Sequence, residues 1–147
     1  MSRPDLDPRV ARFIALFENL TPADVARLPE VYAANVQFKD PFNEVRGVAD
    51  VQRIFGHMFQ TLEQPRFVVR DVVSEGGQCF LSWEMLFRLR RLDRKPQVIR
   101  GASHLVFDAN GRVVLHRDYW DAAEELYEKL PYLGALMRWL KRRVNSP

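Results

Sequence analysis

The hydrophobic pattern has a helical period in the first part of the chain. Up to about residue 60, apolar side chains recur every three or four positions, as in helices that bury one face. Asp7-Pro8 and Thr21-Pro22 each join a capping residue to a proline suited to the first helical position. The pattern predicts helices beginning at these two points, the second continuing to Tyr32, and a third helix after Gly47.

The period changes to two from about residue 66, which is typical of strands with one buried face. The predicted strands are 35–39 before the third helix, then 66–74, 78–92, 97–107 and 112–120. Pro65 is expected to end the segment that contains the third helix, before the first of the long strands begins. Asn110-Gly111 is a strong hairpin signal between the last two. Helices followed by a meander of antiparallel strands predict an α+β fold.

The helical period returns after Trp120. Asp121 is a suitable cap for a long terminal helix, which Pro131 and Gly134 are expected to kink. Its apolar stripe consists of Leu130, Leu133, Leu136, Met137, Leu140 and Val144. We favour packing of this stripe on the body or on a partner subunit; contact with a membrane surface is the alternative. We therefore predict a single domain over 1–147, with a core at about 8–121 and a helical extension at about 122–145.

Composition and charge narrow the function classes. The chain has 147 residues and a net charge of +3, and much of the basic excess lies at 138–143. The body is therefore near neutral, and a nucleic-acid surface is not expected. Cys79 lies in an apolar strand pattern, so it is expected to be a buried thiol. The sequence starts without an apolar signal segment and has no membrane-spanning run, so we expect a cytoplasmic protein.

Metal and cofactor motifs are not found. His57, His104 and His116 lack the spacing of metal ligands, and His57 is expected to be solvated rather than to border a pocket. Gly76-Gly77 fits a hairpin turn better than a phosphate-binding loop. We therefore predict a protein that works without a metal or an organic cofactor.

Asp40 is the first candidate for chemistry. The stretch VQFKDPF places its carboxylate between Phe38 and Phe42 and before Pro41. A charged group in aromatic surroundings needs a partner, a path to solvent or a catalytic role. Two interpretations stay open: Asp40 caps its own turn, or it transfers protons in a pocket.

The late strands carry further candidates. A curved antiparallel sheet with helices across its concave face encloses a pocket lined by alternate residues of each strand. On the last strand, His116, Asp118 and Trp120 share one face. Ser103 lies on one face of its strand, and His104 on the other. One face of the strand at 78–92 is apolar and is expected to border the pocket: Leu81, Trp83, Met85 and Phe87.

Four stretches carry a family resemblance. VARFIALFENL, VYAANVQFKDPF, RGVADVQRIF and HLVFDANGRVVLHRDYW follow one another from about Val10 to Trp120. In this order they resemble the nuclear-transport-factor-2-like superfamily, and within it the SnoaL-like polyketide cyclases and ketosteroid isomerases. The resemblance implies a cone-shaped fold with a pocket and a homodimer formed through the sheet, with His104 toward that surface. The fold alone does not specify a function.

The resemblance also implies roles for individual residues. Asp40 lies where ketosteroid isomerases keep their proton-shuttling carboxylate, and Asp118 where SnoaL-like cyclases place an acid/base aspartate. Phe13 and Ser103 replace the tyrosine and the protonated aspartic acid of the isomerase oxyanion hole. Because a phenyl ring has no donor, steroid isomerisation itself is not expected.

These observations lead to two functional hypotheses. The first is a cofactor-independent isomerase, cyclase or dehydratase acting on an apolar, carbonyl-bearing ligand, with Asp40 and Asp118 moving protons, His116 relaying them and Ser103 stabilising an oxyanion. The second is a non-catalytic module that binds a lipid or hydrophobic metabolite in the same pocket. The predicted ligand-binding residues are Phe13, Tyr32, Phe38, Phe55, Trp83, Met85, Ser103, Leu105 and Trp120.

Overall fold

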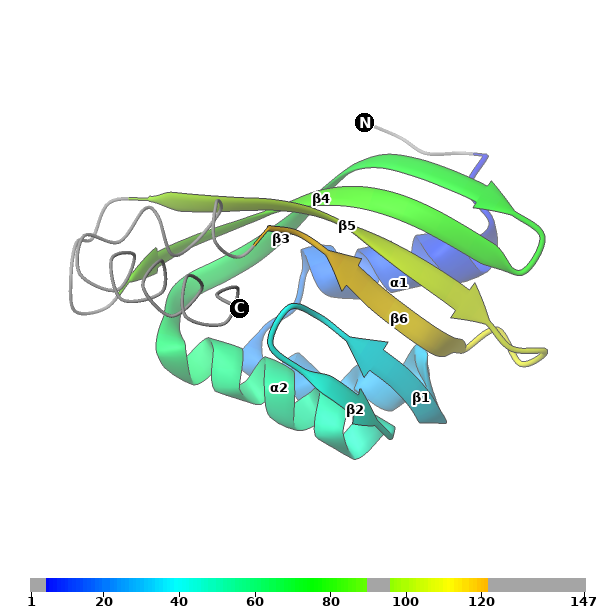
Figure 1. The fold of residues 1–147 in the computed structure, drawn as a ribbon, viewed down its shortest axis with the longest axis horizontal. Helices are drawn as coiled ribbons and strands as arrows, with labels where there is room; N and C mark the ends of the chain where they lie inside the picture. The colour runs from blue at the N-terminus through cyan, green and yellow to red at the C-terminus, as the bar shows by residue number, and fades with distance from the viewer. Residues whose placement is uncertain (1–4, 90–95, 122–147) are drawn as a thin grey trace, which may run out of the picture.

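The computed structural model describes residues 5–89 and 96–121, which form helices packed against one curved sheet (Figure 1). The helical segments are α1 (Pro8–Glu18), the 3-10 helix η1 (Pro22–Glu30) and α2 (Val48–Thr61). The strands are β1 (Tyr32–Lys39), β2 (Glu44–Arg46), β3 (Leu62–Glu75), β4 (Gln78–Leu89), β5 (Gln97–Phe107) and β6 (Val113–Tyr119). This architecture confirms the predicted α+β class.

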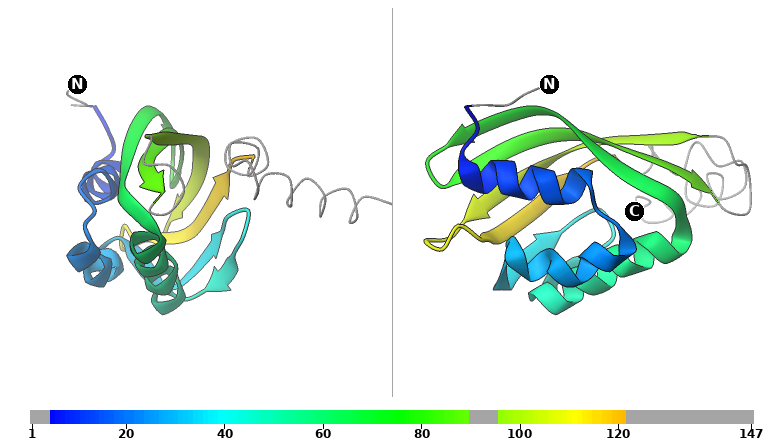
Figure 2. Two further views of the ribbon diagram at one scale, coloured as in Figure 1. Left: turned by 90° about the vertical axis from the view of Figure 1, so that its left-hand side faces the viewer. Right: turned by 180° about the vertical axis from the view of Figure 1, so that it is seen from behind.

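The sheet has the strand order β2-β1-β6-β5-β4-β3. Only the β1–β6 pair is parallel; the other neighbouring pairs within the described residues are antiparallel. The sheet curls so that α1, η1 and α2 lie along its concave side (Figure 2). Residues from the first and last strands therefore meet near the centre of the sheet, where β1 adjoins β6.

The residues just before α1 and α2 explain how these two helices begin. Asp7 accepts a hydrogen bond from the backbone N–H of Arg9 at 2.9 Å and caps α1. Gly47 precedes α2 with φ = 105°, a conformation that glycine adopts without strain. Both helices place their apolar stripes in the core, including Phe13 and Phe17 of α1 and Phe55 of α2.

The second predicted helix is wrong in type and in extent. It is a 3-10 helix that ends at Glu30, and Tyr32 begins β1 instead of continuing it. Pro29 lies inside the segment and cannot donate a backbone hydrogen bond, which limits a regular α-helix. Tyr32 then pairs with Val113 of β6, so the strand starts three residues before the predicted position 35.

Two strands also differ from the prediction. The three-residue β2 was not predicted, and β3 begins at Leu62 rather than after Pro65. The pairing of β3 with β4 shifts register between Glu63 and Arg66, and Gln64 adopts φ = 51° there. This irregularity accommodates Pro65, which has no N–H for the ladder.

Some predictions fall outside the described residues. The helical extension at 122–145, with its packing or membrane contact, lies beyond Asp121, and the end predicted for the strand at 78–92 lies beyond Leu89. Among the residues that are described, no helix is both long and apolar enough to cross a membrane.

Candidate functional site

A cavity of about 580 Å³ opens between the concave face of the sheet and α2. Its apolar lining consists of Phe38, Phe42, Ile54, Phe55, Met58, Leu62, Phe67, Trp83, Met85, Phe87, Ile99 and Trp120. Its polar lining consists of Asp40, Asn43, Arg53, His57, Thr61 and Asp118. A volume within roughly 300–1,000 Å³, mostly apolar and with a few polar groups, is typical of small-molecule sites.

Asp118 lies at the junction of a buried hydrogen-bond chain that runs from β1 to β4. Its Oδ1 lies 2.6 Å from Nε2 of His116 and 2.5 Å from Oγ of Ser103. Beyond His116, Nδ1 lies 2.6 Å from the hydroxyl of Tyr32. Beyond Ser103, Nε1 of Trp83 donates to Oγ at 2.8 Å. Five side chains from four strands are therefore joined in one network.

The chemistry of the partners sets the direction of each hydrogen bond. The indole of Trp83 can only donate, so Ser103 accepts from it and donates its own proton to Asp118. An ionised Asp118 can only accept, so Nε2 of His116 carries a proton. A neutral His116 then accepts at Nδ1 from the hydroxyl of Tyr32. In this assignment each of the four hydrogen bonds holds one proton.

The two oxygens of Asp118 are therefore not equivalent. Oδ1 receives both short hydrogen bonds, while no hydrogen bond within residues 5–89 and 96–121 reaches Oδ2. The Asp118 side chain lines the cavity and is 15% exposed, whereas that of His116 is 5% exposed. Oδ2 is therefore the carboxylate oxygen without a partner among the described residues, and His116 lies behind Asp118, outside the cavity lining.

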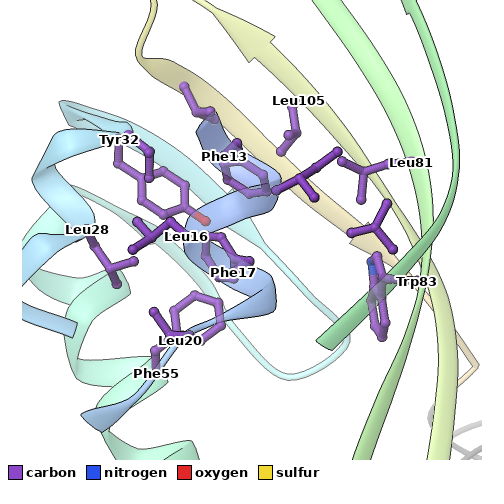
Figure 3. Packing of buried hydrophobic residues seen from close by; sticks show 14 of the residues in the cluster. Phe13, Leu16, Phe17, Leu20, Leu28, Tyr32, Phe55, Leu81, Trp83 and Leu105 are labelled. Atoms are coloured by element: carbon purple, nitrogen blue, oxygen red, sulfur yellow. The ribbon is translucent and has the colours of Figure 1, made fainter. Parts of the chain in front are cut away.

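The far end of the network is enclosed by aromatic rings. Tyr32 is fully buried, and its ring stacks on His116 with 5.8 Å between centroids. Figure 3 shows Tyr32 beside Phe13 and Phe17 of α1, across the core from Trp83. Burial, with a further contribution from the charge of Asp118, raises the pKa of Tyr32 well above its usual value. Tyr32 therefore stays protonated at neutral pH and remains a hydrogen-bond donor.

Asp40 is held at another part of the cavity wall. Its Oδ1 accepts from the backbone N–H groups of Phe42 and Asn43, both at 2.7 Å. The side-chain amide of Asn43 reaches both carboxylate oxygens, at 3.1 and 3.2 Å. Asp40 thus caps its own turn while also lining the cavity, so the capping interpretation describes its hydrogen bonds.

The helix α2 supplies a polar rim to the cavity. Arg53 and His57, one helical turn apart, both line the cavity and are both exposed. Arg53 pairs with Asp50 at 3.2 Å. Thr61 donates to the carbonyl of His57 at 2.9 Å, and its Oγ1 lies 3.3 Å from Nε2 of the same histidine. His57 is therefore both solvated and at the rim, where only solvation was expected.

The structure separates the predicted binding residues into two groups. Phe38, Phe55, Trp83, Met85 and Trp120 line the cavity. The others lie outside its lining, in the buried layer: Phe13, Tyr32, Ser103 and Leu105. Of the predicted catalytic residues, Asp40 and Asp118 line the cavity and His116 is buried behind Asp118.

Sequence reasoning did not select several cavity residues. Ile54, Met58 and Phe67 line the cavity beside the predicted aromatic residues. The spacing of Ile54 and Met58, one turn apart on α2, is the signal that would have found them. Asn43 was missed because nothing in its local pattern connects it with Asp40.

A metal site or a reactive thiol would place specific requirements on the other His, Cys, Asp and Glu side chains. In the part of the chain that is described, no three His, Cys, Asp or Glu side chains gather as a metal site would require. Cys79 is buried, and this burial raises its pKa to about 11, so its thiol stays protonated at neutral pH.

Comparison with known proteins identifies the family. The sequence profile of the SnoaL-like domain matches residues 10–116, so the chain belongs to the SnoaL-like domain family. A search of curated proteins finds no match.

Solved structures show the same fold at low sequence identity. The chain is similar to a hypothetical protein with a ketosteroid isomerase-like fold from Catenulispora acidiphila, in complex with trimethylamine, at 14% identity and a TM-score of 0.71 over 88% of this chain and 96% of that one. A candidate SnoaL-like polyketide cyclase from Jannaschia sp. CCS1 is 14% identical, with a TM-score of 0.68 over 84% and 93%.

An LEH-like epoxide hydrolase from M. tuberculosis is also similar, at 16% identity and a TM-score of 0.63 over 94% of each chain. These similarities establish the NTF2-like, ketosteroid isomerase-like fold that the sequence predicted.

Proposed function

We propose that this member of the SnoaL-like family is a cofactor-independent enzyme that moves a proton on an apolar, carbonyl-bearing small molecule. Asp118 is the proton-transferring group. The observation that carries the proposal is the asymmetric carboxylate of a cavity-lining residue, with Oδ1 bound by His116 and Ser103 and Oδ2 without a partner among the described residues. A carboxylate fixed in this way at an apolar cavity is suited to act as a general base.

The chemistry starts at a carbon next to the ligand carbonyl. Oδ2 of Asp118 takes the proton, and the electron pair of the C–H bond moves to the carbonyl oxygen to form an enolate. Returning the proton to another carbon gives isomerisation; attack of the enolate on a second carbonyl gives cyclisation. Loss of a neighbouring hydroxyl as water gives dehydration. The hydrogen bonds at Oδ1 need not change while Oδ2 gains or loses the proton.

His116 and Tyr32 serve Asp118 without touching the ligand. The Nε2–H group of His116 stabilises the ionised carboxylate, and Tyr32 fixes the imidazole by donating to Nδ1. Ser103 donates its only hydroxyl proton to Asp118. In this arrangement Ser103 supports the base rather than an oxyanion, a different role from the one that the family resemblance implied.

Deuterium exchange tests the proposal before the natural substrate is known. The protein is incubated in D₂O with bicyclic and tricyclic ketones, and exchange next to the carbonyl is followed by NMR. General-base catalysis is expected to accelerate exchange by about 10²–10⁴-fold over buffer for ketones that bind. Asp118→Asn should return the rate to that of buffer.

Asp71→Asn is the matched control. Asp71 lies exposed on β3, accepts a hydrogen bond from the Ser82 hydroxyl and does not line the cavity. This variant should accelerate deuterium exchange into the ketones as much as the wild type does. Full activity in Asp118→Asn would overturn the proposal.

The alternative function is a non-catalytic binding module that uses the same apolar cavity. Its supporting observation is that Asp40 is engaged in its turn, which leaves Asp118 as the one carboxylate with an unpartnered oxygen among the described residues of the cavity lining. Mass spectrometry of the denatured protein would reveal a co-purified hydrophobic molecule. Saturable binding of ketones without any exchange would favour this alternative.

A further inference from the structure

Trp83 has two different surroundings at once. Its indole ring lines the cavity and meets Phe67 edge to face, with 6.0 Å between ring centroids. Its Nε1–H donates to Ser103, which is 2% exposed and does not line the cavity. The same side chain thus touches the space for a ligand and the buried hydrogen-bond network.

The sheet register places this connection across three adjacent strands. Ser103 of β5 lies directly opposite Asp118 of β6. Trp83 of β4 lies opposite Gly101, two residues before Ser103 on the same strand. The indole therefore leans along β5 to reach the serine hydroxyl, and the serine reaches across to the carboxylate.

Gly101 makes the position of the indole possible. A Cβ atom at this residue would lie 2.6 Å from both Cη2 and Cζ2 of Trp83, and 3.1 Å from Cβ of Trp120. Such contacts are too close, so any side chain at position 101 would displace the ring. Because the ring is rigid and tied to Ser103 at Nε1, displacing it would disturb that hydrogen bond.

We propose that Trp83 and Ser103 form a positioning arm that couples a ligand on the indole ring to the orientation of the Asp118 carboxylate. The inference rests on the proposed function, since Asp118 is the reacting group. A ligand that packs against the ring holds Nε1 against Ser103, and Ser103 in turn keeps Oδ1 bound and Oδ2 toward the ligand. Trp83 thereby favours flat, ring-containing substrates, because these stack best on an indole.

The arm can be tested without any substrate. With ¹⁵N-labelled tryptophan and ¹³C-labelled aspartate, NMR follows the indole N–H of Trp83 and the carboxyl carbon of Asp118 as the pH is changed. Both signals are expected to share one titration midpoint, and the Trp83 titration should disappear in Asp118→Asn. Among the described residues, the other charged or titratable groups that line the cavity with Asp118 are Asp40, Arg53 and His57, and His116 and Tyr32 lie behind it.

Ser103→Ala removes the connection. The carboxyl-carbon signal of Asp118 should then still change with pH. The Trp83 signal should no longer follow it. Gly101→Ala should uncouple the two signals in the same way while keeping Ser103 and Asp118.

Ser82→Ala is the matched control, because it removes a serine–aspartate hydrogen bond to Asp71 on the opposite face of the same sheet. It should leave both signals unchanged. If the indole N–H signal of Trp83 in the wild type does not change when Asp118 titrates, the proposed positioning arm is wrong. Failure of ketone exchange with an intact NMR coupling would instead overturn only the enzymatic function.

Discussion

Asp40 shows how one side chain can be structural and still border a site. Its Oδ1 accepts two backbone hydrogen bonds of 2.7 Å, which fix the turn between β1 and β2. This turn places Phe42 against Trp120 at the cavity, with 5.5 Å between ring centroids. We therefore expect the main effect of removing Asp40 to be on the turn.

Asp40→Ala should lower the free energy of unfolding by about 1–2 kcal/mol, because two backbone donors lose their partner. Urea denaturation measures this loss. Asp108→Ala is the comparison, since Asp108 caps the β5–β6 turn by accepting from the backbone of Asn110 and Arg112. Similar losses in both variants would establish the capping role. An unfolding midpoint equal to that of the wild type in Asp40→Ala would contradict it.

At the scale of elements, regular patterns were predictable and irregular ones were not. The alternation along β5 predicted Gln97–Phe107 without error, because many positions there repeat the same period. The three residues of β2 carry too few repeats to be recognised, and the start of β1 depends on its partner strand β6. Pairing between distant strands decides such boundaries, and the local pattern does not contain it.

The start of α1 gives a prediction on pH. Arg9 donates to Asp7 from its side chain and its backbone, and these hydrogen bonds lower the pKa of Asp7 to about 2. A lowered pKa stabilises the fold at pH values above the unfolded pKa of 3.8, and the stabilisation is lost as the pH falls toward 2. Asp7→Ala should therefore cost about 1 kcal/mol at pH 7 and progressively less below pH 4.

Asp7→Asn separates the cap from the charge. Asparagine keeps a neutral acceptor for the backbone N–H of Arg9 but has no charge and cannot titrate. At pH 7 this variant should therefore lie between the wild type and Asp7→Ala, and its difference from Asp7→Ala should not change below pH 4. Urea denaturation between pH 2 and 7 measures both variants. A constant difference between wild type and Asp7→Ala over this range would show that the Asp7 charge does not stabilise the fold.

At the scale of the molecule, the shared face of neighbouring residues on one strand was predictable but the network between strands was not. Alternation correctly placed His116 and Asp118 on one face of β6, where they share a hydrogen bond, and Trp120, just beyond the strand, lines the cavity with Asp118. The partner of His116 is Tyr32, 84 positions earlier in the chain, which the helical pattern had assigned to a helix. The parallel contact of β1 with β6 creates this pair, and no local signal reports a parallel contact. The hydrogen bond from Trp83 to Ser103 depends in the same way on the register of β4 and β5.

The outer face of the sheet carries an apolar row that the cavity does not explain. Val73, Phe80 and His104 lie opposite one another on β3, β4 and β5, and Arg117 of β6 follows in the same row. Val73 is 69% and Phe80 48% exposed, and the Phe80 ring stacks on His104 with 4.2 Å between centroids. Such a row is suited to an identical row on a second copy of the chain.

We expect a homodimer that buries this row. Fully burying a large apolar side chain contributes roughly 1.5–3 kcal/mol, and a two-fold contact buries the same residues in both copies. Light scattering coupled to size-exclusion chromatography should give the mass of a dimer for the wild type and of a monomer for Phe80→Asp. Ala26→Asp, an exposed change on η1, should remain a dimer. Since Phe80 points away from the cavity, the monomer should keep the Trp83–Asp118 coupling. A wild-type protein that stays monomeric at all concentrations would mean that the row does not join two copies.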